Sequence, residues 1–305
     1  MDWRKHACQT LKNDRDARVG AWSGHPESAP RVEPTALSAL ALLCGDDPPA
    51  ARTIGRQAAD WLASQQRADG GLPAALGLDA SNWPTALAII LWSALELETE
   101  PRRKACRRLL DASRDATPAA GGRSDAAPAG WPWVDGTYTW IEPTALAIIA
   151  LGREGKSSHR RVIEGVGMLH DRALGKGGWN AGNKAVFGRE LRPQPTATAL
   201  ALLALAAHGD RSHASGKAVD YLRTALEHIR SALSLGWGLI ALRAWNAYPS
   251  QADQWLEEAH ELRAERDHSP ASLALLLLAS SQLGVQLLIP RGANAPALDP
   301  TRGPR

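Results

Sequence analysis

A short phrase built around a proline recurs five times along the chain, and this repetition constrains the fold more than any other feature. Three copies consist of Glu or Trp followed by Pro-Thr-Ala-Leu, at residues 33–37, 83–87 and 142–146. Two weaker copies occupy residues 194–197 and 269–273. A fixed supersecondary unit that returns in this way predicts a repeat architecture.

Each phrase is expected to open a helix. Proline suits the first helical position, because its missing N–H has no partner there and its φ is already helical. The residues that follow are apolar nearly all round, which is typical of a helix buried on every side. Such helices are predicted at residues 36–43, 86–97, 145–151, 198–207 and 273–279, and residues 235–242 supply a sixth in the long gap before the last phrase.

Between these runs lie segments that mix charged and apolar residues at helical spacing, which predicts one face toward solvent. They cover residues 52–66, 102–114, 159–172, 215–230 and 251–263, and residues 2–12 supply a sixth. The alternation predicts an all-α fold, a closed (α/α)6 toroid of six inner and six outer helices. An open solenoid is the alternative, but it needs polar terminal caps, and the last inner helix, at residues 271–283, is among the most apolar.

The repeats are spread evenly, so we expect a single toroid domain over residues 1–289 and a disordered, Pro- and Gly-rich tail over residues 290–305. A net charge of +3 from interspersed acids and bases predicts a solvated exterior and no nucleic-acid partner. Three scattered cysteines favour a reducing, cytoplasmic location. We expect no signal peptide, and we expect the apolar residues 270–289 to form an inner helix rather than a membrane span.

One outer helix and the loop after it carry a recognisable motif. Residues 61–66 read Trp-Leu-Ala-Ser-Gln-Gln, and residues 69–72 read Asp-Gly-Gly-Leu. The pattern resembles the repeat of squalene–hopene and oxidosqualene cyclases, in which an aromatic residue, Leu and Gln precede Gly-x-Trp. Here Leu72 replaces the final Trp, and residues 130–131 and 177–179 keep the second half. The resemblance covers nearly the whole chain and implies a one-toroid member of the terpenoid cyclase and protein prenyltransferase superfamily.

The same resemblance implies an acid at the start of an inner helix, because these cyclases carry Asp-x-Asp-Asp before Thr-Ala. Residues 31–36 and 140–145 keep an acid only at the central position, as Glu33 and Glu142, and the flanking carboxylates are missing. Protein prenyltransferase β-subunits bind zinc through Asp, Cys and His, but the chain has no Asp-x-Cys pairing. We therefore expect no metal site and no cofactor.

Glu33 and Glu142 are the candidate catalytic residues, and both are expected at the same mouth of the barrel. A carboxyl walled by indole rings is held protonated by burial, and such an acid can protonate an alkene or an epoxide. A purely structural role, in which each Glu complements the helix dipole, stays open. The candidate substrate-binding residues are Trp83, Trp92, Trp133, Trp140, Trp179, Gln194 and Trp237, and a packing role stays open for each tryptophan.

Two functions follow from these residues. The first, slightly favoured, is an acid-initiated isoprenoid cyclase or isomerase that uses Glu33 or Glu142. The alternative is a non-catalytic isoprenoid-binding or protein-interaction scaffold, which the missing Asp triad favours. A carbohydrate-active enzyme with a carboxylate pair is disfavoured by the apolar inner helices. The expected partner is an apolar isoprenoid-type ligand, while catalytic activity, a peripheral membrane contact and a partner protein stay open.

Overall fold

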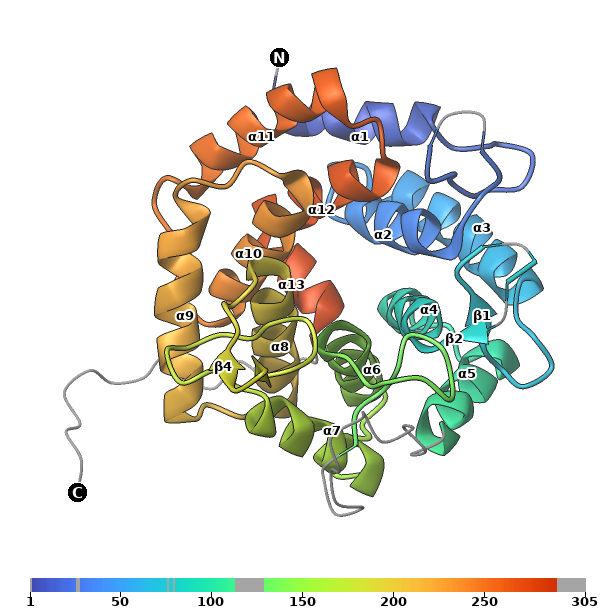
Figure 1. Ribbon diagram of the computed structural model, residues 1–305. Coiled ribbons are helices and arrows are strands. Elements are labelled where there is room, and N and C mark those ends of the chain that lie inside the picture. The colour runs from blue at the N-terminus through green and yellow to red at the C-terminus, as the bar shows by residue number, and fades with distance from the viewer. Residues whose placement is uncertain (1, 26–27, 76, 79, 113–128, 290–305) are drawn as a thin grey trace.

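Helices dominate the computed structural model, which describes residues 2–25, 28–75, 77–78, 80–112 and 129–289. They form an inner ring surrounded by an outer ring (Figure 1). Within these residues the inner ring consists of six helices, α2 (Val32–Leu42), α4 (Asn82–Ala94), α6 (Ile141–Arg153), α8 (Pro195–His208), α10 (Ala232–Ala244) and α12 (Pro270–Ser280). The described outer helices are α1 (Trp3–Asn13), α3 (Pro48–Ser64), α5 (Glu100–Asp111), α7 (Arg160–Asp171), α9 (His213–Leu226) and α11 (Ala252–Arg266).

The inner ring is closed. Each inner helix packs against the next one along the chain, and α12 packs against α2, so the first and last inner helices are neighbours. In the outer ring α1 packs against α12 as well as α2 and bridges the same junction. This arrangement confirms the predicted closed (α/α)6 toroid and excludes the open solenoid, whose terminal repeats would not meet.

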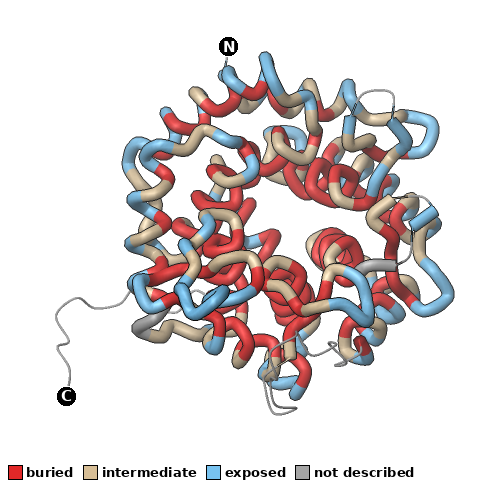
Figure 2. Tube along the Cα trace, in the orientation of Figure 1, coloured by how far each residue is buried: buried red, intermediate tan, exposed pale blue. Residues whose placement is uncertain are grey.

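Burial separates the two rings as the sequence pattern predicts. In α8 every residue from 197 to 207 is buried. By contrast, α3 buries a single stripe, made of Ala51, Gly55, Ala58, Ala59 and Leu62. This spacing of three and four residues is one face of a helix. Figure 2 shows the same contrast around the molecule, with inner helices almost wholly buried and outer helices exposed on their outer side.

The prolines of the repeated phrase do not all occupy the predicted first position. Pro195 and Pro270 are the first residues of their helices, but Pro34, Pro84 and Pro143 are the third. Both positions are compatible with proline, because the first four N–H groups of a helix have no partner within it. The phrases therefore do mark helix N-termini, while their register differs by two residues between repeats.

A threonine fastens each of the first four inner helices to the loop before it. Its hydroxyl accepts a hydrogen bond of 2.8–3.0 Å from a backbone N–H, in the pairs Trp22–Thr35, Leu72–Thr85, Trp131–Thr144 and Trp179–Thr198. Each of these three tryptophans also donates its indole N–H to a carbonyl of the preceding outer helix, at 2.7–2.9 Å. The Gly-Trp loops thus lock neighbouring repeats together.

The last apolar stretch departs from the prediction of one inner helix over residues 271–283. The helix α12 ends at Ser280, and a seventh apolar helix, α13 (Gln282–Leu288), continues at an angle of 111° to it. Gly284 permits this turn, because a Cβ there would clash with the Leu278 carbonyl. Since α13 packs against α2, α4, α6, α10 and α12, it closes the end of the barrel opposite the helix N-termini.

Two short hairpins lie in the loops that lead into inner helices. The strand β1 (Leu72–Pro73) pairs antiparallel with β2 (Ala80–Ser81) before α4. The strand β3 (Ala185–Val186) pairs antiparallel with β4 (Arg189–Glu190) before α8. No single helix of the described residues is long and apolar enough to cross a membrane, although α12 and α13 together pass that test across their bend.

Candidate active site at the mouth of the barrel

Two rings of side chains line the end of the barrel at which the inner helices begin, which we call the mouth. The second residues of the inner helices form the outer of these rings: Glu33, Trp83, Glu142, Thr196, Leu233 and Ala271. Residues four positions further along a helix lie on the same face, one turn deeper. This deeper ring is apolar and comprises Leu37, Leu87, Leu146, Leu200, Trp237 and Leu275.

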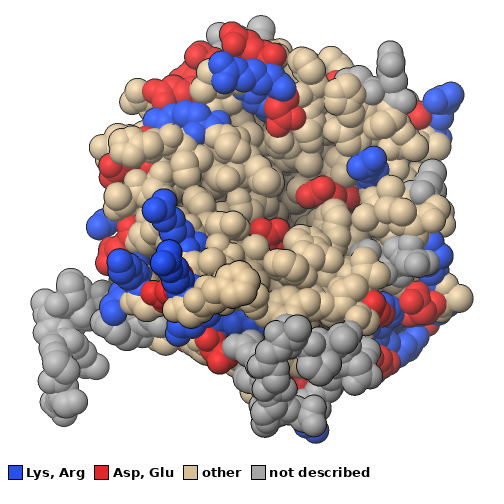
Figure 3. Space-filling model, in the orientation of Figure 1, with Lys and Arg blue, Asp and Glu red and all other residues tan. Residues whose placement is uncertain are grey.

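The two rings enclose a cavity of about 460 Å³. Most of its wall comes from nine ring members: Glu33, Trp83, Glu142, Thr196, Leu233, Leu87, Leu146, Leu200 and Trp237. Trp133, Gln194, Pro195 and Ser234 complete it. Figure 3 shows the hollow at the centre of this face, with acidic side chains inside a largely uncharged surround. A mostly apolar cavity with a few convergent polar groups is the usual form of a small-molecule site.

The two acids of the cavity are half-buried and unpaired. Neither Glu33 nor Glu142 has a hydrogen-bond or ion-pair partner within the described residues. Burial raises the pKa of both carboxyls. The charge of Glu142 raises the pKa of Glu33 further, against a lowering by Arg31. Two carboxyls that repel each other in an apolar cavity retain a proton to a higher pH than exposed carboxyls do.

We expect the raised pKa to make the stability of the protein depend on pH. A carboxyl whose pKa is higher in the folded state stabilises that state at low pH, and this contribution is lost as pH rises through the folded pKa. Glu33→Gln removes the ionisable group, so its free energy of unfolding should exceed that of the wild type at pH 8 and show no such gain at pH 4. Urea titrations at both pH values measure the free energies of unfolding of the variant and the wild type. If the two proteins differ by the same amount at pH 4 and pH 8, the charge of Glu33 is not buried.

An aromatic wall stands between the two acids. The helix α4 lies between α2 and α6 in the ring, so Trp83 separates Glu33 from Glu142. Trp133 meets Trp83 edge to face, with ring centroids 5.8 Å apart and planes at 81°. Trp237 of α10 lies across the ring from α4, one turn deeper, and is buried. Indole faces attract cations, so this wall can stabilise a positive charge that forms near either acid.

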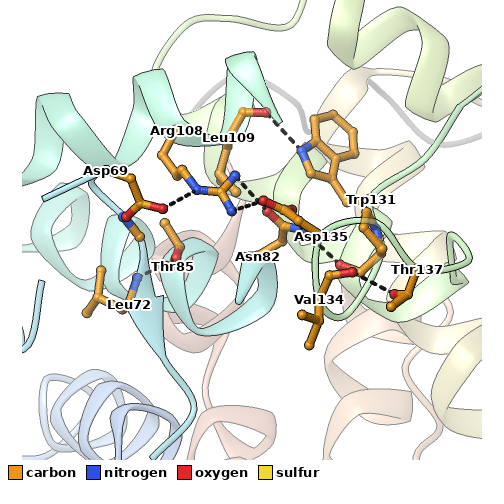
Figure 4. Close-up of polar contacts among 12 residues, drawn as sticks. Asp69, Leu72, Asn82, Thr85, Arg108, Leu109, Trp131, Val134, Asp135 and Thr137 are labelled. Atoms are coloured by element: carbon orange, nitrogen blue, oxygen red, sulfur yellow. Dashed lines mark hydrogen bonds and ion pairs between the residues drawn. The ribbon is translucent and has the colours of Figure 1, made fainter. Parts of the chain in front are cut away.

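A polar network fixes the loop that carries Trp133. The Arg108 guanidinium of α5 donates to Asp69 at 3.1 Å and pairs with Asp135 (Figure 4). The buried Asn82, the first residue of α4, donates its side-chain amide to the same Asp135 at 3.2 Å. The loop before α6 is thereby tied to α4 and α5, which holds Trp133 at the mouth of the barrel.

The wall opposite the acids carries a group of polar side chains that was only partly anticipated. The hydroxyl groups of Thr196 and Ser234 are 3.2 Å apart, and Gln194 lies beside them. Gln194 and Glu33 each directly precede the proline of their repeated phrase, which predicts equivalent positions for them. That alignment is wrong. Because Pro195 is the first residue of α8, Gln194 precedes the helix and Thr196 takes the position of Glu33. Counting from the proline missed Thr196, and Ser234 was missed because the repeat that contains α10 has no proline to count from.

Three predicted substrate-binding tryptophans lie outside the cavity wall. Trp92 is buried and donates its indole N–H to the Ala59 carbonyl of α3 at 3.1 Å. Trp179 belongs to the loop that fastens α8. Trp140 precedes α6 and packs edge to face on Tyr138, with centroids 5.6 Å apart. Their positions indicate the packing role, whereas Trp83, Trp133, Trp237 and Gln194 do line the cavity.

Metal ligands do not gather at this site. In the part of the chain that the structure describes, no group of three or more His, Cys, Asp or Glu residues is arranged to hold a metal ion. The carboxyls of Glu33 and Glu142 can donate a proton, and the indole rings of the cavity can stabilise a positive charge.

The closed ring of inner and outer helices is the α/α toroid fold that solved terpenoid cyclases share. Type II terpene cyclase MstE from Scytonema, without ligand, has a TM-score of 0.64 at 16% identity over 94% of this chain and 97% of its own. An MstE variant in complex with geranylgeranyl dihydroxybenzoate, its substrate, has a TM-score of 0.59 at 18% identity over 93% of this chain and 79% of its own.

A second terpenoid enzyme is also similar. The ent-copalyl diphosphate synthase of Streptomyces platensis has a TM-score of 0.54 at 17% identity, over 84% of this chain and 50% of its own. No protein-family model and no curated protein matches the sequence. At these identities the likeness is one of fold.

Proposed function

We propose that this protein binds a polyprenyl substrate in the mouth cavity and converts it by acid-initiated cyclisation or isomerisation. The observation that carries the proposal is the pair Glu33 and Glu142, which have raised carboxyl pKa values and no hydrogen-bond or ion-pair partner among the described residues, beside indole rings in an apolar cavity. Carboxyl groups with perturbed pKa values in a cleft are typical of general acids.

The proposed reaction is redox-neutral. The carboxyl of one Glu gives its proton to a terminal alkene carbon, so a C–H bond forms and a tertiary cation remains. In a cyclisation, a second alkene of the same chain attacks this cation and a C–C bond closes the ring. The last cation then loses a proton to form an alkene, and solvent returns a proton to the Glu. The faces of Trp83 and Trp133 stabilise the cations on the way.

The class of substrate is supported by the cavity and by the neighbours. Nine of its thirteen lining residues come from two rings in which apolar and indole side chains predominate, which suits a hydrocarbon chain. The MstE variant was solved with geranylgeranyl dihydroxybenzoate. Because the shared feature is the fold, which by itself licenses no activity, this comparison supports a candidate ligand class for this chain.

A second function, a non-catalytic isoprenoid-binding scaffold, is favoured by one observation. Arg31 and Pro34 occupy positions next to Glu33 where the resembling cyclases carry further carboxylates. Binding without turnover would follow if a single central acid is too weak to start the reaction. The two functions share the cavity, so they differ only in whether a bound polyprenyl chain is converted.

Filling the cavity tests the ligand site that both functions require. Leu200 lines the cavity and is 3% exposed, so Leu200→Trp adds a ring to the space a ligand would occupy. We expect the affinity for geranylgeraniol to fall by about tenfold or more, since each excluded methylene contributes roughly 0.8 kcal/mol. Leu262→Trp, on the exposed side of α11, is the matched control. Equal affinity in both variants, measured by tryptophan fluorescence titration, would exclude this cavity.

A further inference from the structure

The hairpin between β3 and β4 presents the single phenylalanine of the chain to solvent. Phe187 lies at the tip of the hairpin, and its side chain is fully exposed, at 102% of the reference value. The adjacent Val186 is 40% exposed. A large apolar side chain held entirely in water gains nothing from the core of the protein.

The backbone at the same position is strained. Phe187 and Gly188 form the two-residue turn and have φ angles of +49° and +74°. Hairpin turns with two positive φ angles prefer Asn and Gly, and a bulky residue with positive φ is an outlier. Phe187 is thus unfavourable for the fold both in exposure and in conformation. Strain that the fold does not require is a reason to look for a function.

The hairpin is firmly attached to the rest of the molecule. The Tyr138 hydroxyl donates to the Asn183 side chain at 2.5 Å, and the Ile141 N–H donates to the Ala181 carbonyl at 2.8 Å. Within the hairpin, the Leu191 N–H donates to the residue 184 carbonyl at 2.9 Å. The loop then runs directly into Gln194 and α8, so the hairpin stands beside the mouth cavity.

Basic residues flank the hairpin. Lys176, Lys184, Arg189 and Arg192 are exposed and have no ion-pair partner within the described residues. The nearby acid, Glu190, accepts a hydrogen bond from the Gly175 N–H at 2.5 Å. Figure 3 shows Lys and Arg side chains gathered over the hairpin on this face of the molecule.

Further apolar side chains are exposed around the mouth. Leu78, Val134 and Leu233 are 54%, 43% and 45% exposed. The first two lie in loops that lead into α4 and α6, and Leu233 is the second residue of α10. Since every inner helix begins at the mouth, these side chains and the hairpin share one face.

We propose that this face docks on an anionic lipid bilayer, with Phe187 and Val186 inserted between the lipids and the four basic residues at the headgroups. An apolar tip on a hairpin flanked by cations matches an anionic membrane surface. The docking is inferred from the exposed residues of this face and does not depend on the proposed function. Its purpose, the transfer of a polyprenyl chain from the bilayer to the adjacent cavity, rests on the proposed function.

Vesicle co-sedimentation with the full chain tests the docking. We expect binding to phosphatidylglycerol vesicles that weakens with added salt, and much weaker binding to phosphatidylcholine vesicles. Phe187→Asn should lower the partition coefficient by about tenfold, because the buried ring is lost. The same variant should melt at a higher temperature than the wild type, since Asn tolerates the turn. Phe187→Trp should retain binding.

Two matched controls complete the experiment. Ile163→Gln removes an exposed apolar side chain from α7, which lies away from the mouth, and should bind like the wild type. Lys184→Ala with Arg189→Ala should weaken binding by roughly fivefold per charge, whereas Arg52→Ala with Arg56→Ala on α3 should not. Equal binding of the wild type and Phe187→Asn, or equal binding to both lipids, would overturn the proposal.

The outcome is separable from that of the proposed function. With substrate dissolved in detergent, Phe187→Asn should keep wild-type turnover because the cavity is unchanged. The double variant Glu33→Gln with Glu142→Gln should bind vesicles normally while losing turnover. Failure of vesicle binding alone would remove the docking and leave the cavity chemistry intact.

Discussion

Replacing both mouth acids, Glu33→Gln together with Glu142→Gln, is expected to lower turnover of a polyprenyl substrate by about 10³-fold. General acid catalysis typically contributes 10²–10⁴-fold, and an amide has no proton of comparable acidity to give. Glutamine keeps the shape of glutamate, so the affinity for geranylgeraniol should stay close to that of the wild type. Turnover is measured by gas chromatography of extracted products.

The single variants identify the acid. If Glu33 is the donor, Glu33→Gln should account for nearly all of the loss and Glu142→Gln for the smaller part that its charge contributes to the Glu33 pKa. Glu257→Gln, on the exposed side of α11, is the matched control and should keep full activity. Full activity of the double variant on every substrate converted by the wild type would contradict acid catalysis by this pair.

The pH profile carries the same prediction. The protonated carboxyl is the active form, so turnover should be highest at low pH and fall as pH rises through the pKa of the acid. Burial places that pKa above the ordinary value of 4.5 for glutamate. If turnover instead falls at the pH at which an exposed glutamate ionises, burial does not raise the pKa of the catalytic acid.

Gly130→Ala is expected to destabilise the protein strongly, with a loss of about 3 kcal/mol in the free energy of unfolding. A Cβ at Gly130 would clash with the Thr144 hydroxyl that fastens α6 and would approach the Met168 Cε to 3.1 Å. Overpacking costs roughly 1–3 kcal/mol, and the disturbed hydrogen bond adds about 1 kcal/mol. The Arg161 guanidinium donates to the Gly130 carbonyl at 2.6 Å, so the backbone at this position is held on both sides.

A second glycine supplies the control for this prediction. Gly216 lies inside α9, and a Cβ there would meet nothing within 4 Å. Gly216→Ala should therefore stabilise the protein by about 0.5–1 kcal/mol, the usual gain from replacing a helical glycine. Urea unfolding of both variants measures the difference. A loss below about 1 kcal/mol in Gly130→Ala would show that the threonine contact contributes little to holding α6.

The repeated phrase predicts most of the fold, because the physics it encodes is local. A proline in the first turn followed by an apolar run marks a buried helix, and this held for every phrase. The break at Ser280 was not predicted, although Ser280, Ser281 and Gln282 interrupt the apolar run there, because serine and glutamine also occur inside continuous helices. What bends the chain is the packing of α13 across the end of the barrel, and that depends on contacts distant in sequence.

The cavity was predictable only in part, for a related reason. Glu33 and Glu142 were identifiable from their place at the start of an apolar helix. The sequence did not distinguish the tryptophans that line the cavity from those that pack neighbouring repeats together, because the same residue type serves both roles. Trp179 uses its indole N–H to fasten an outer helix, whereas Trp83 faces the cavity. Trp83 is the second residue of α4, whereas Trp179 lies in the loop before α8, and the sequence leaves the start of each helix uncertain by two residues.

Incubation of the wild-type protein with geranylgeraniol and with squalene in D₂O measures proton donation most directly. A carboxyl of Glu33 or Glu142 exchanges its proton with solvent, so protonation of the alkene should place one deuterium on a carbon of the product. Mass spectrometry should then show a product one mass unit heavier than in H₂O, and almost none from the double Gln variant. A product without carbon-bound deuterium, equal labelling by the double variant, or binding of both probes without any conversion would contradict acid-initiated catalysis.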